Sequence, residues 1–259
     1  MAMRLLTIPV SHFCEKARWA LDRAGLSYVE KAYLPIAHLI PVWLAGGGRM
    51  VPVLVDGKTA ITDSTAILKH VDARLPDDQK LFPAQPALRQ QVEKWEDTFD
   101  EQLGPATRRW AYFHVLPDQK MTARTIRGSV GPLARAALPI FSPLVARLIR
   151  RRYRISGESS ARSFQRIQAV FDQVNALLSD GRRYLMGDRF SAADLTFASL
   201  AVPALLPPES GAPMPRLEEL PAEMAAAVGE FRRSPAGAFA LRLYKAHRQS
   251  GSARDMGQA

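Results

Sequence analysis

The sequence predicts an α/β domain over residues 1–76 followed by an all-helical domain over residues 87–250. In the first stretch, short apolar runs of strand length alternate with stretches of helical spacing, whereas beyond it the apolar residues recur with helical spacing. Between the two lies a polar, proline-bearing segment, LPDDQKLFPAQP, and residues 77–86 form the predicted linker. Residues 251–259 are expected to form a loose tail.

The first elements follow from changes in the apolar period. Residues 4–10 have the length of a strand, and HFCEKARWALDRAG at 12–25 has helical spacing, with Gly25 placed as the C-cap. SYVEKAYL at 27–34 predicts a second strand. The glycine-rich stretch 36–48 predicts a short helix that runs into a loop.

A β-hairpin and a helix complete this part. VPVLVDGKTAIT at 51–62 predicts a hairpin around an Asp56-Gly57 turn, and residues 63–76 predict the closing helix. The order β-α-β-α-β-β-α, with a parallel first half and an antiparallel hairpin at the end, is that of a thioredoxin-like domain.

The rest of the chain has helical spacing. Residues 87–113 predict a helix that Gly104-Pro105 bends or interrupts, because a proline inside a helix removes a hydrogen bond. Residues 119–156 alternate arginine-rich and apolar turns broken by prolines. A regular amphipathic helix at 160–180 and a segment at 191–205 follow. A proline-rich loop at 207–221 then leads to a last helix that ends near His247.

Composition excludes several classes of protein. With 259 residues, 47% of them hydrophobic, the chain can bury a large core. Its single cysteine, Cys14, excludes an internal disulfide framework and a cysteine-based zinc site. The histidines are scattered, so no metal is expected. The first apolar run is too short for a signal peptide, and no stretch approaches the roughly 18 apolar residues that span a bilayer. We therefore expect a soluble, cytoplasmic protein.

The net charge of +10 is concentrated in arginines of the middle and C-terminal parts, notably RLIRRRYR at 147–154. Such a run can attract phosphates or an anionic membrane surface, or it can simply be a solvated helix face. No zinc finger, RNP-type sequence or aromatic-basic interleaving accompanies it, so no nucleic-acid partner is expected. Peripheral membrane contact through 147–154 stays open as an alternative.

Two local features of the first domain suit the binding of a peptide-like ligand. RMVPVLV places Pro52 at the start of a strand. A cis Val51-Pro52 bond would leave the backbone of Val51 free to pair with a peptide, although an ordinary trans proline is the alternative. In TDSTAI, Asp63 or Ser64 begins a helix directly after a strand, where an amino acid's carboxylate and ammonium can bind. A simple N-cap is the alternative.

The third feature is the stretch SHFCEKARW at 11–19. Ser11 lies at the strand end or helix N-cap, so its hydroxyl is directed above the sheet edge. Cys14 lies one turn inside the helix, on the face of Ala17 and Leu21 that is expected to pack on the sheet.

Together these stretches resemble the cytosolic glutathione transferase superfamily, in a bacterial-type form with serine at the active-site position. SHFCEKARWAL resembles the family's SPYCRKVRIAL-type stretch, RMVPVLVDG its KVPVLVDG element and ITDSTAIL its ESxAI element. YLMGDRFSAADLTFASLAV resembles the signature of the family's helical domain. Here Ser191 and Asp194 can also form a capping box.

The resemblance implies glutathione as co-substrate, no metal, and a homodimer. It implies that Ser11 is the catalytic residue, that Val51 beside Pro52 pairs with the cysteinyl backbone, and that Asp63 and Ser64 hold the γ-glutamyl end. The glycyl end would be met by Arg49 or, as a weaker candidate, His38. Candidate walls for a hydrophobic electrophile are aromatic, although aromatic residues at helical spacing also form cores. They are Phe13, Trp110, Tyr112 and Phe113.

Two other functions stay open. Cys14 could act as the nucleophile of a glutathione-dependent thiol-disulfide oxidoreductase, but related enzymes place that cysteine at the position of Ser11, where the helix N-terminus lowers its pKa. The chain could also be a non-catalytic binding or scaffold protein. The expected activity is the conjugation of glutathione thiolate to hydrophobic electrophiles, a detoxification reaction.

Overall fold

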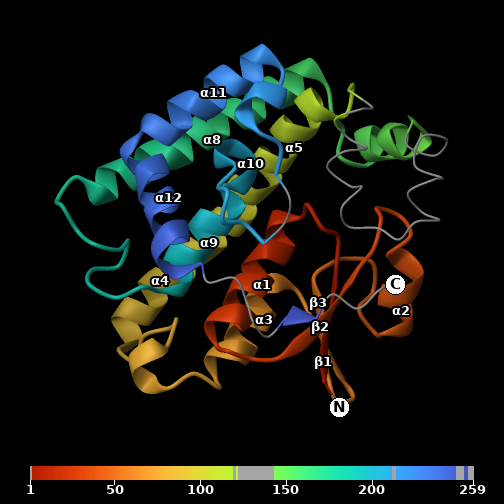
Figure 1. Cartoon of the computed structure of the whole chain (residues 1–259). Coiled ribbons are helices and arrows are strands. Elements are labelled where there is room, and N and C mark those ends of the chain that lie inside the picture. Colours follow the sequence, from red (N-terminus) through yellow and green to blue (C-terminus); the bar gives the residue numbers. More distant parts are fainter. Residues whose placement is uncertain (1, 119–120, 122–142, 212–213, 249–253, 256–259) are drawn as a thin grey trace.

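The computed structural model describes residues 2–118, 121, 143–211, 214–248 and 254–255 (Figure 1). A mixed sheet flanked by helices forms the N-terminal part, and the part that follows is mostly helical. This confirms the predicted thioredoxin-like domain followed by an all-helical domain. The prediction for residues 119–120 and 122–142, in the arginine-rich segment, lies outside the described residues.

The sheet has the strand order β4-β3-β1-β2-β5. β1 runs parallel to β2 and antiparallel to β3, and β3 and β4 form the predicted hairpin. The strands are β1 (Met3–Thr7), β2 (Tyr28–Ala32), β3 (Val53–Asp56), β4 (Thr59–Thr62) and β5 (Arg254–Asp255).

Helices cover both faces of the sheet, because the strand side chains alternate between the two. Leu5 and Leu54 lie in the large core that contains α1 (His12–Arg23) and α3 (Ser64–Asp72). Leu6 and Val53 pack with Val42 on the opposite face, under α2 (Leu39–Leu44). The short helix predicted in the loop is therefore the cover of the second face.

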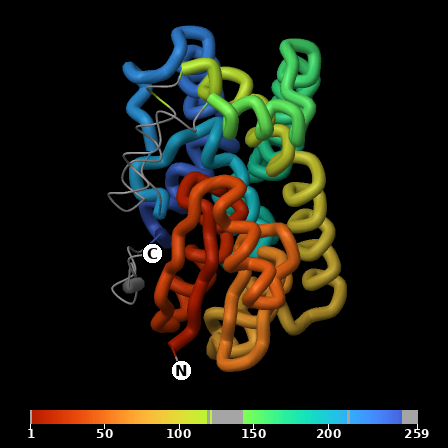
Figure 2. Tube along the Cα trace, turned by 90° about the vertical axis from the view of Figure 1, so that its right-hand side faces the viewer, coloured from red at the N-terminus to blue at the C-terminus, as the bar shows by residue number. Residues whose placement is uncertain are grey.

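The C-terminal part stacks its helices beside α1 and α3 (Figures 1 and 2). It begins after a 3-10 turn, η1 (Asp77–Gln79). Residues 143–152 are helical as well. The other elements are α4 (Pro86–Thr98), the π-helical η2 (Phe99–Leu103), α5 (Gly104–Val115), α8 (Gly157–Leu178), α9 (Ala192–Leu200), α10 (Val202–Leu205), the 3-10 turn η3 (Leu217–Glu219), α11 (Ala222–Arg233) and α12 (Pro235–His247).

Two predicted boundaries are confirmed at residue level. The break at Gly104-Pro105 is present as the π-helical turn η2, after which α5 begins with Pro105 in its first turn, where no backbone donor is needed. α9 begins at the predicted capping box, in which the N–H of Ser191 donates to the Asp194 carboxylate at 2.8 Å.

Two predictions about the C-terminal end are corrected. The last helix is two helices, because Ser234 caps a new helix through the N–H of Gly237 and Pro235 occupies its first position. The tail is not wholly loose, since Arg254–Asp255 pair with β2 as a fifth strand. The remaining tail residues lie outside the described residues.

A buried lysine joins the two parts of the chain. Lys16 of α1 is fully buried, and its ammonium donates to Thr65 at 3.1 Å, to Asp100 at 2.8 and 2.9 Å, and to Glu96. Thr65 lies in the first turn of α3, and the two carboxylates come from α4 and η2. A buried charge is tolerated only when it is paired, so this cluster fixes α1 and α3 against the helical part.

We expect Lys16→Ala to lower the free energy of unfolding by about 3–5 kcal/mol, because it leaves Glu96 and Asp100 without their buried cation. Lys69→Ala is the matched control, since Lys69 on α3 pairs with Glu93 at the surface and its loss should cost below about 1 kcal/mol. Urea denaturation measures both values. Similar losses in the two variants would show that the Lys16 cluster is not a special constraint.

Candidate functional site

The strand register brings the three predicted site segments to one edge of the sheet. Leu6 pairs with Val53, and Val53 pairs with Thr62. The end of β1, the start of β3 and the end of β4 therefore lie side by side. Ser11, Val51 and Asp63 each lie within a few residues of these strand ends, and the N-termini of α1 and α3 point to the same edge (Figure 1). Such an edge is where open α/β sheets bind ligands.

Ser11 is the N-cap of α1. Its backbone is extended, with φ −76° and ψ 118°, and its hydroxyl oxygen accepts a hydrogen bond from the Cys14 N–H at 3.4 Å. The hydroxyl is only partly buried and keeps its own proton for donation. It therefore presents a donor at the positive end of a helix.

Cys14 lies in the core, as the helix face predicted. Its side chain has no exposed surface, and Ala17 and Leu21 on the same face are equally buried. Burial raises the pKa of the Cys14 thiol, although Arg18 and the hydrogen bond with Ser11 act in the opposite direction. These two properties disfavour an exposed thiolate at this position.

The Val51–Pro52 peptide bond is cis, and β3 begins just after it, at Val53. Within the described residues, neither the N–H nor the C=O of Val51 takes part in a hydrogen bond. Pro52 is buried and Val51 is partly exposed. The backbone of Val51 is thus available to an extended ligand in the way a free strand edge is.

Asp63 caps α3. One of its carboxylate oxygens, Oδ1, accepts from the N–H of Thr65 at 2.8 Å and from that of Ala66 at 3.2 Å. The backbone of Asp63 has φ 81°, a strained value for a residue with a side chain, and such strain often accompanies a binding role. Asp63 is exposed whereas Ser64 is buried. An exposed carboxylate thus sits beside backbone donors at a helix start.

His38 and Arg49, the two candidates for the glycyl end of the ligand, have different surroundings in the loop before β3. His38 uses both ring nitrogens on the loop itself, because Nδ1 accepts from the Ile36 N–H at 3.1 Å and Nε2 donates to the Arg49 carbonyl at 3.3 Å. Burial lowers the pKa of His38, so the ring stays neutral. The Arg49 side chain is exposed. Arg49 is therefore the better placed cation, and His38 holds the loop that carries it.

The helical part meets this edge through one stripe of α5. The Phe13 ring lies against Gly104, where a Cβ would approach Phe13 Cζ to 2.5 Å. The Arg108 guanidinium lies 5.7 Å from the Phe13 ring and 4.4 Å from the Tyr153 ring. Burial, followed by the neighbouring Tyr153, raises the pKa of Tyr112 to about 12, so this phenol keeps its proton. Aromatic and cationic side chains thus gather around Phe13, two residues after Ser11.

Of the predicted aromatic walls, Trp110 is placed differently. Its side chain is buried in the core, against Phe164 and Phe231. Phe113 lies towards Gly157 at the start of α8. Because a helix turns about 100° per residue, positions 104, 108 and 112 share one stripe, and Trp110 is directed to the other side. Phe13 and Tyr112 remain at the candidate site.

Three further residues of this region were not predicted. Arg108 and Tyr153 contact each other beside Phe13. His12 is buried and neutral, because burial and Arg108 lower its pKa to about 3, and its Nε2 donates to the Gly104 carbonyl at 2.9 Å. The sequence could have indicated Arg108, because it lies four residues before Tyr112 and therefore on the same face of the predicted helix. Nothing in the sequence pointed to Tyr153, which comes from a distant segment.

The described residues contain no group of three or more metal-binding side chains that could hold a metal ion. In the same part of the chain, no helix combines the length and the apolar character needed to cross a bilayer.

The fold and this sheet edge define a thioredoxin-like protein with an appended helical domain. The family model described as "Glutathione S-transferase, N-terminal domain" matches residues 5–79, and the corresponding C-terminal domain model matches residues 157–221. Together these segments make up more than half of the chain. The chain therefore belongs to the glutathione S-transferase superfamily.

Solved structures share the fold at low sequence identity. A glutathione S-transferase of Ceriporiopsis subvermispora in complex with glutathione is 18% identical, with a TM-score of 0.64 over 97% of this chain and 100% of that one. A glutathione S-transferase of Pseudomonas fluorescens is 20% identical, with a TM-score of 0.61 over 96% and 98%. The beta-etherase of Sphingobium sp. strain SYK-6 is 19% identical, with a TM-score of 0.58 over 93% and 99%. No curated protein sequence matches the chain.

The contact between Phe13 and Gly104 generates a prediction. We expect Gly104→Ala to destabilise the protein by about 1–3 kcal/mol, because the added methyl overlaps the Phe13 ring in a packed contact. Gly229→Ala is the control. It lies in α11, where the new Cβ meets only the mobile end of Arg233 at 3.4 Å, and it should be neutral or stabilise by up to about 1 kcal/mol. Thermal unfolding of both variants measures the difference; equal behaviour would contradict the close contact.

Proposed function

We propose that the protein conjugates the thiolate of glutathione to hydrophobic electrophiles, with Ser11 as the donor that stabilises the thiolate. The observation that carries this proposal is the position of Ser11. Its hydroxyl lies at the N-terminus of α1, on the sheet edge that also carries the cis Val51–Pro52 bond and the cap of α3. Membership of the glutathione S-transferase superfamily supports a reaction of this kind.

The three segments at the edge suit the parts of glutathione. The N–H and C=O of Val51 would pair with the cysteinyl backbone as an added strand. Asp63 and the first N–H groups of α3, with Ser64, would hold the γ-glutamyl ammonium and carboxylate. Arg49, exposed at the end of the preceding loop, would meet the glycyl carboxylate. The Ceriporiopsis protein, which has this fold, was solved with glutathione bound.

The chemistry requires the ionised form of the ligand's thiol. A free cysteine-like thiol has a pKa near 8.5, and only the thiolate is a good nucleophile. Lowering that pKa by about two units requires about 2.7 kcal/mol, which one charge-assisted hydrogen bond and a helix N-terminus can supply. The thiol proton leaves to solvent. The sulfur then forms a bond to the electrophilic carbon, and the leaving group departs with the electron pair of the broken bond.

We infer that the electrophile lies against the group formed by Phe13, Arg108 and Tyr112, because Phe13 follows Ser11 by two residues and Arg108 lies 5.7 Å from the Phe13 ring. The phenol of Tyr112 stays protonated, and the Arg108 cation is held between two rings. Both can donate to an electronegative substituent or to a leaving group, while Phe13 contacts its apolar body. The substrate class that this wall suits is therefore an aromatic or apolar electrophile that carries a polar substituent.

The two alternatives have different requirements. A thiol-disulfide oxidoreductase would need Cys14 as an exposed thiolate, whereas the Cys14 side chain is buried and its pKa is raised. A non-catalytic scaffold would need no Ser11 donor, and weak turnover despite retention on immobilised glutathione would favour it. A homodimer is the expectation from the family, and sedimentation equilibrium tests it. The cytoplasmic location is an expectation from the sequence alone.

We expect Ser11→Ala to lower kcat/KM for an aryl halide by about 10- to 100-fold, because one charge-assisted hydrogen bond to the sulfur is lost. The pKa of bound glutathione, followed by thiolate absorbance, should rise by about one to two units. Glutathione affinity should change little.

Cys14→Ala is the matched control for Ser11→Ala, because it changes a residue one turn further along α1 and keeps the Ser11 hydroxyl. It should retain conjugation. Loss of disulfide reduction in this variant, with conjugation of Ser11→Ala intact, would overturn the assignment and favour the oxidoreductase.

Asp63→Asn tests the γ-glutamyl site. Asparagine keeps an oxygen for the N–H groups of Thr65 and Ala66, so the helix cap and the stability should survive. It removes the negative charge, and we expect the Kd for glutathione to rise by about 10-fold. Isothermal titration calorimetry measures the Kd, and an unchanged value would show that the carboxylate does not hold the ammonium.

A further inference from the structure

The large hydrophobic side chains that the described residues expose are confined to two segments. One segment is α2 with its flanking loop, and the other is the helix 143–152. Both lie on the right-hand side of Figure 1, the side that faces the viewer in Figure 2. The exposed residues are Ile36, Leu39, Ile40, Trp43, Leu44, Met50, Leu144 and Leu148. We call them the apolar face.

The helix 143–152 exposes both apolar and positively charged side chains. Leu144 and Leu148, 56% and 43% exposed, are one turn apart and therefore form a short apolar stripe on its outer side. Arg147, Arg151 and Arg152 flank this stripe and are exposed as well. A leucine stripe bordered by arginines is typical of helices that lie in a membrane interface rather than in water.

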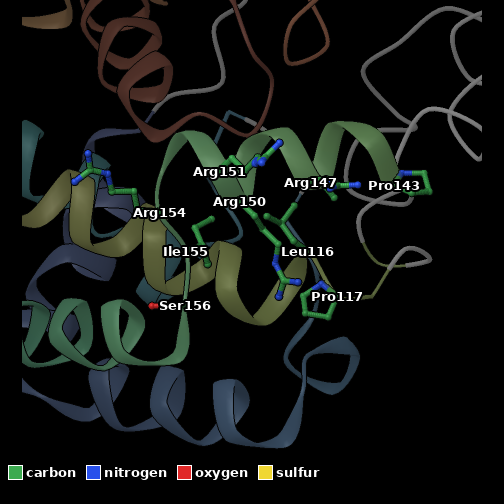
Figure 3. Close-up of a pocket in the computed structure, with 10 residues that line it drawn as sticks. Leu116, Pro117, Pro143, Arg147, Arg150, Arg151, Arg154, Ile155 and Ser156 are labelled. Atoms are coloured by element: carbon green, nitrogen blue, oxygen red, sulfur yellow. The ribbon is translucent and has the colours of Figure 1, made fainter.

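An arginine-lined groove runs along one side of this helix. It has a volume of about 690 Å³, and Figure 3 shows its arginines together with Leu116, Pro117 and Ile155 of the neighbouring segments. Within the described residues, none of these arginines forms an ion pair with a carboxylate. Arginine keeps its proton, so four positive charges are held close together here, an arrangement that favours the binding of an anionic ligand. The arginines are Arg147, Arg150, Arg151 and Arg154.

The α2 segment provides the apolar part of the same side. Ile40, Trp43 and Leu44 are between 69% and 71% exposed on a helix of six residues. Tryptophan is enriched where protein meets the interface of a bilayer, because its ring is apolar and its N–H is polar. A tryptophan between two exposed aliphatic side chains is costly in water and favourable at such an interface.

We propose that this side of the molecule binds the surface of an anionic phospholipid bilayer. The arginines of the groove meet lipid phosphates, and the apolar face enters the boundary between headgroups and acyl chains. The unpaired positive charge argues for an anionic surface, and the exposed leucines and tryptophan argue for a surface with an apolar layer behind the charge. A nucleic acid would use the arginines and leave the apolar face in water.

This proposal does not depend on the proposed enzymatic activity. The sheet edge with Ser11 and the groove at 143–156 are formed by different residues. Membrane binding can therefore fail while glutathione conjugation is present, or the reverse. If both hold, the protein meets apolar electrophiles where they are most concentrated.

Co-sedimentation of the full chain with vesicles tests the proposal. At about 50 mM salt, we expect binding to phosphatidylcholine vesicles that contain about 30 mol% phosphatidylglycerol and little binding to pure phosphatidylcholine vesicles. Raising the salt to about 0.5 M NaCl should abolish the binding to the anionic vesicles. Equal, salt-insensitive binding to the neutral vesicles, or no binding to either, would overturn it.

Two variants separate the charged and the apolar contributions. Arg147→Gln, Arg150→Gln and Arg151→Gln combined should weaken the apparent Kd for the anionic vesicles by about 100-fold, since each basic side chain near the surface contributes roughly fivefold. Leu144→Ser with Leu148→Ser should weaken it by at least about tenfold. All five side chains are exposed, so the fold should persist, and circular dichroism checks this.

The matched control removes the same charge elsewhere. Arg4→Gln, Arg166→Gln and Arg233→Gln change exposed arginines of β1, α8 and α11. Their combination should leave vesicle binding within about twofold. An equal loss in this control would mean that net charge alone drives adsorption. A leucine variant that converts an oligomer to a monomer without affecting vesicle binding would mean that the helix is an interface between copies. Either result overturns the proposal.

Discussion

The buried ammonium of Lys16 is the constraint on which the site depends. A cation without exposed surface must keep its carboxylate partners, and these come from α4 and η2, while Thr65 ties the cluster to the first turn of α3. The cluster therefore links the helix that begins at Ser11 with the helix that begins at Asp63. The two helix starts keep their mutual position because moving either would separate buried charges.

The opposite side of α1 carries a second buried set of charges. Arg18 donates to Glu30 of β2 at 2.8 and 2.9 Å, and Arg248 donates to Glu15 and Asp22 at 2.7 Å each. Glu15 also accepts from the N–H of Gly211 at 3.0 Å. α1 is thus fixed to the sheet through Glu30, to the loop at Gly211, and to Arg248 at the end of α12. A helix held on all sides presents its N-terminus as a rigid donor, which is what a preorganised site requires.

Local signals predicted most of the fold, and contacts between distant segments account for what was missed. Three of these signals involve only neighbouring residues and can therefore be predicted from the sequence. They are Gly25, whose φ is 61°, the Asp56-Gly57 turn and the Ser191 capping box. The sequence leaves Trp110 open as a pocket wall or a core residue, because aromatic character does not reveal which neighbour a helix face meets, and the structure buries it. The Phe13, Arg108 and Tyr153 group joins three segments, and the role of His38 depends on a carbonyl eleven residues away. A charge run alone could not show that the arginines at 147–154 form no ion pair with a carboxylate among the residues that the structure describes.

The pairing of β5 with β2 has a consequence for the solution behaviour of the protein. An open sheet has an outermost strand on each side, and the unpaired N–H and C=O groups of these two strands can pair with strands from other molecules. Arg254–Asp255 pair with Tyr28 and Val29, so this short strand covers part of the β2 backbone that a foreign strand would use. Residues 254–255 thereby leave less of the β2 backbone open to pairing with a strand of another molecule.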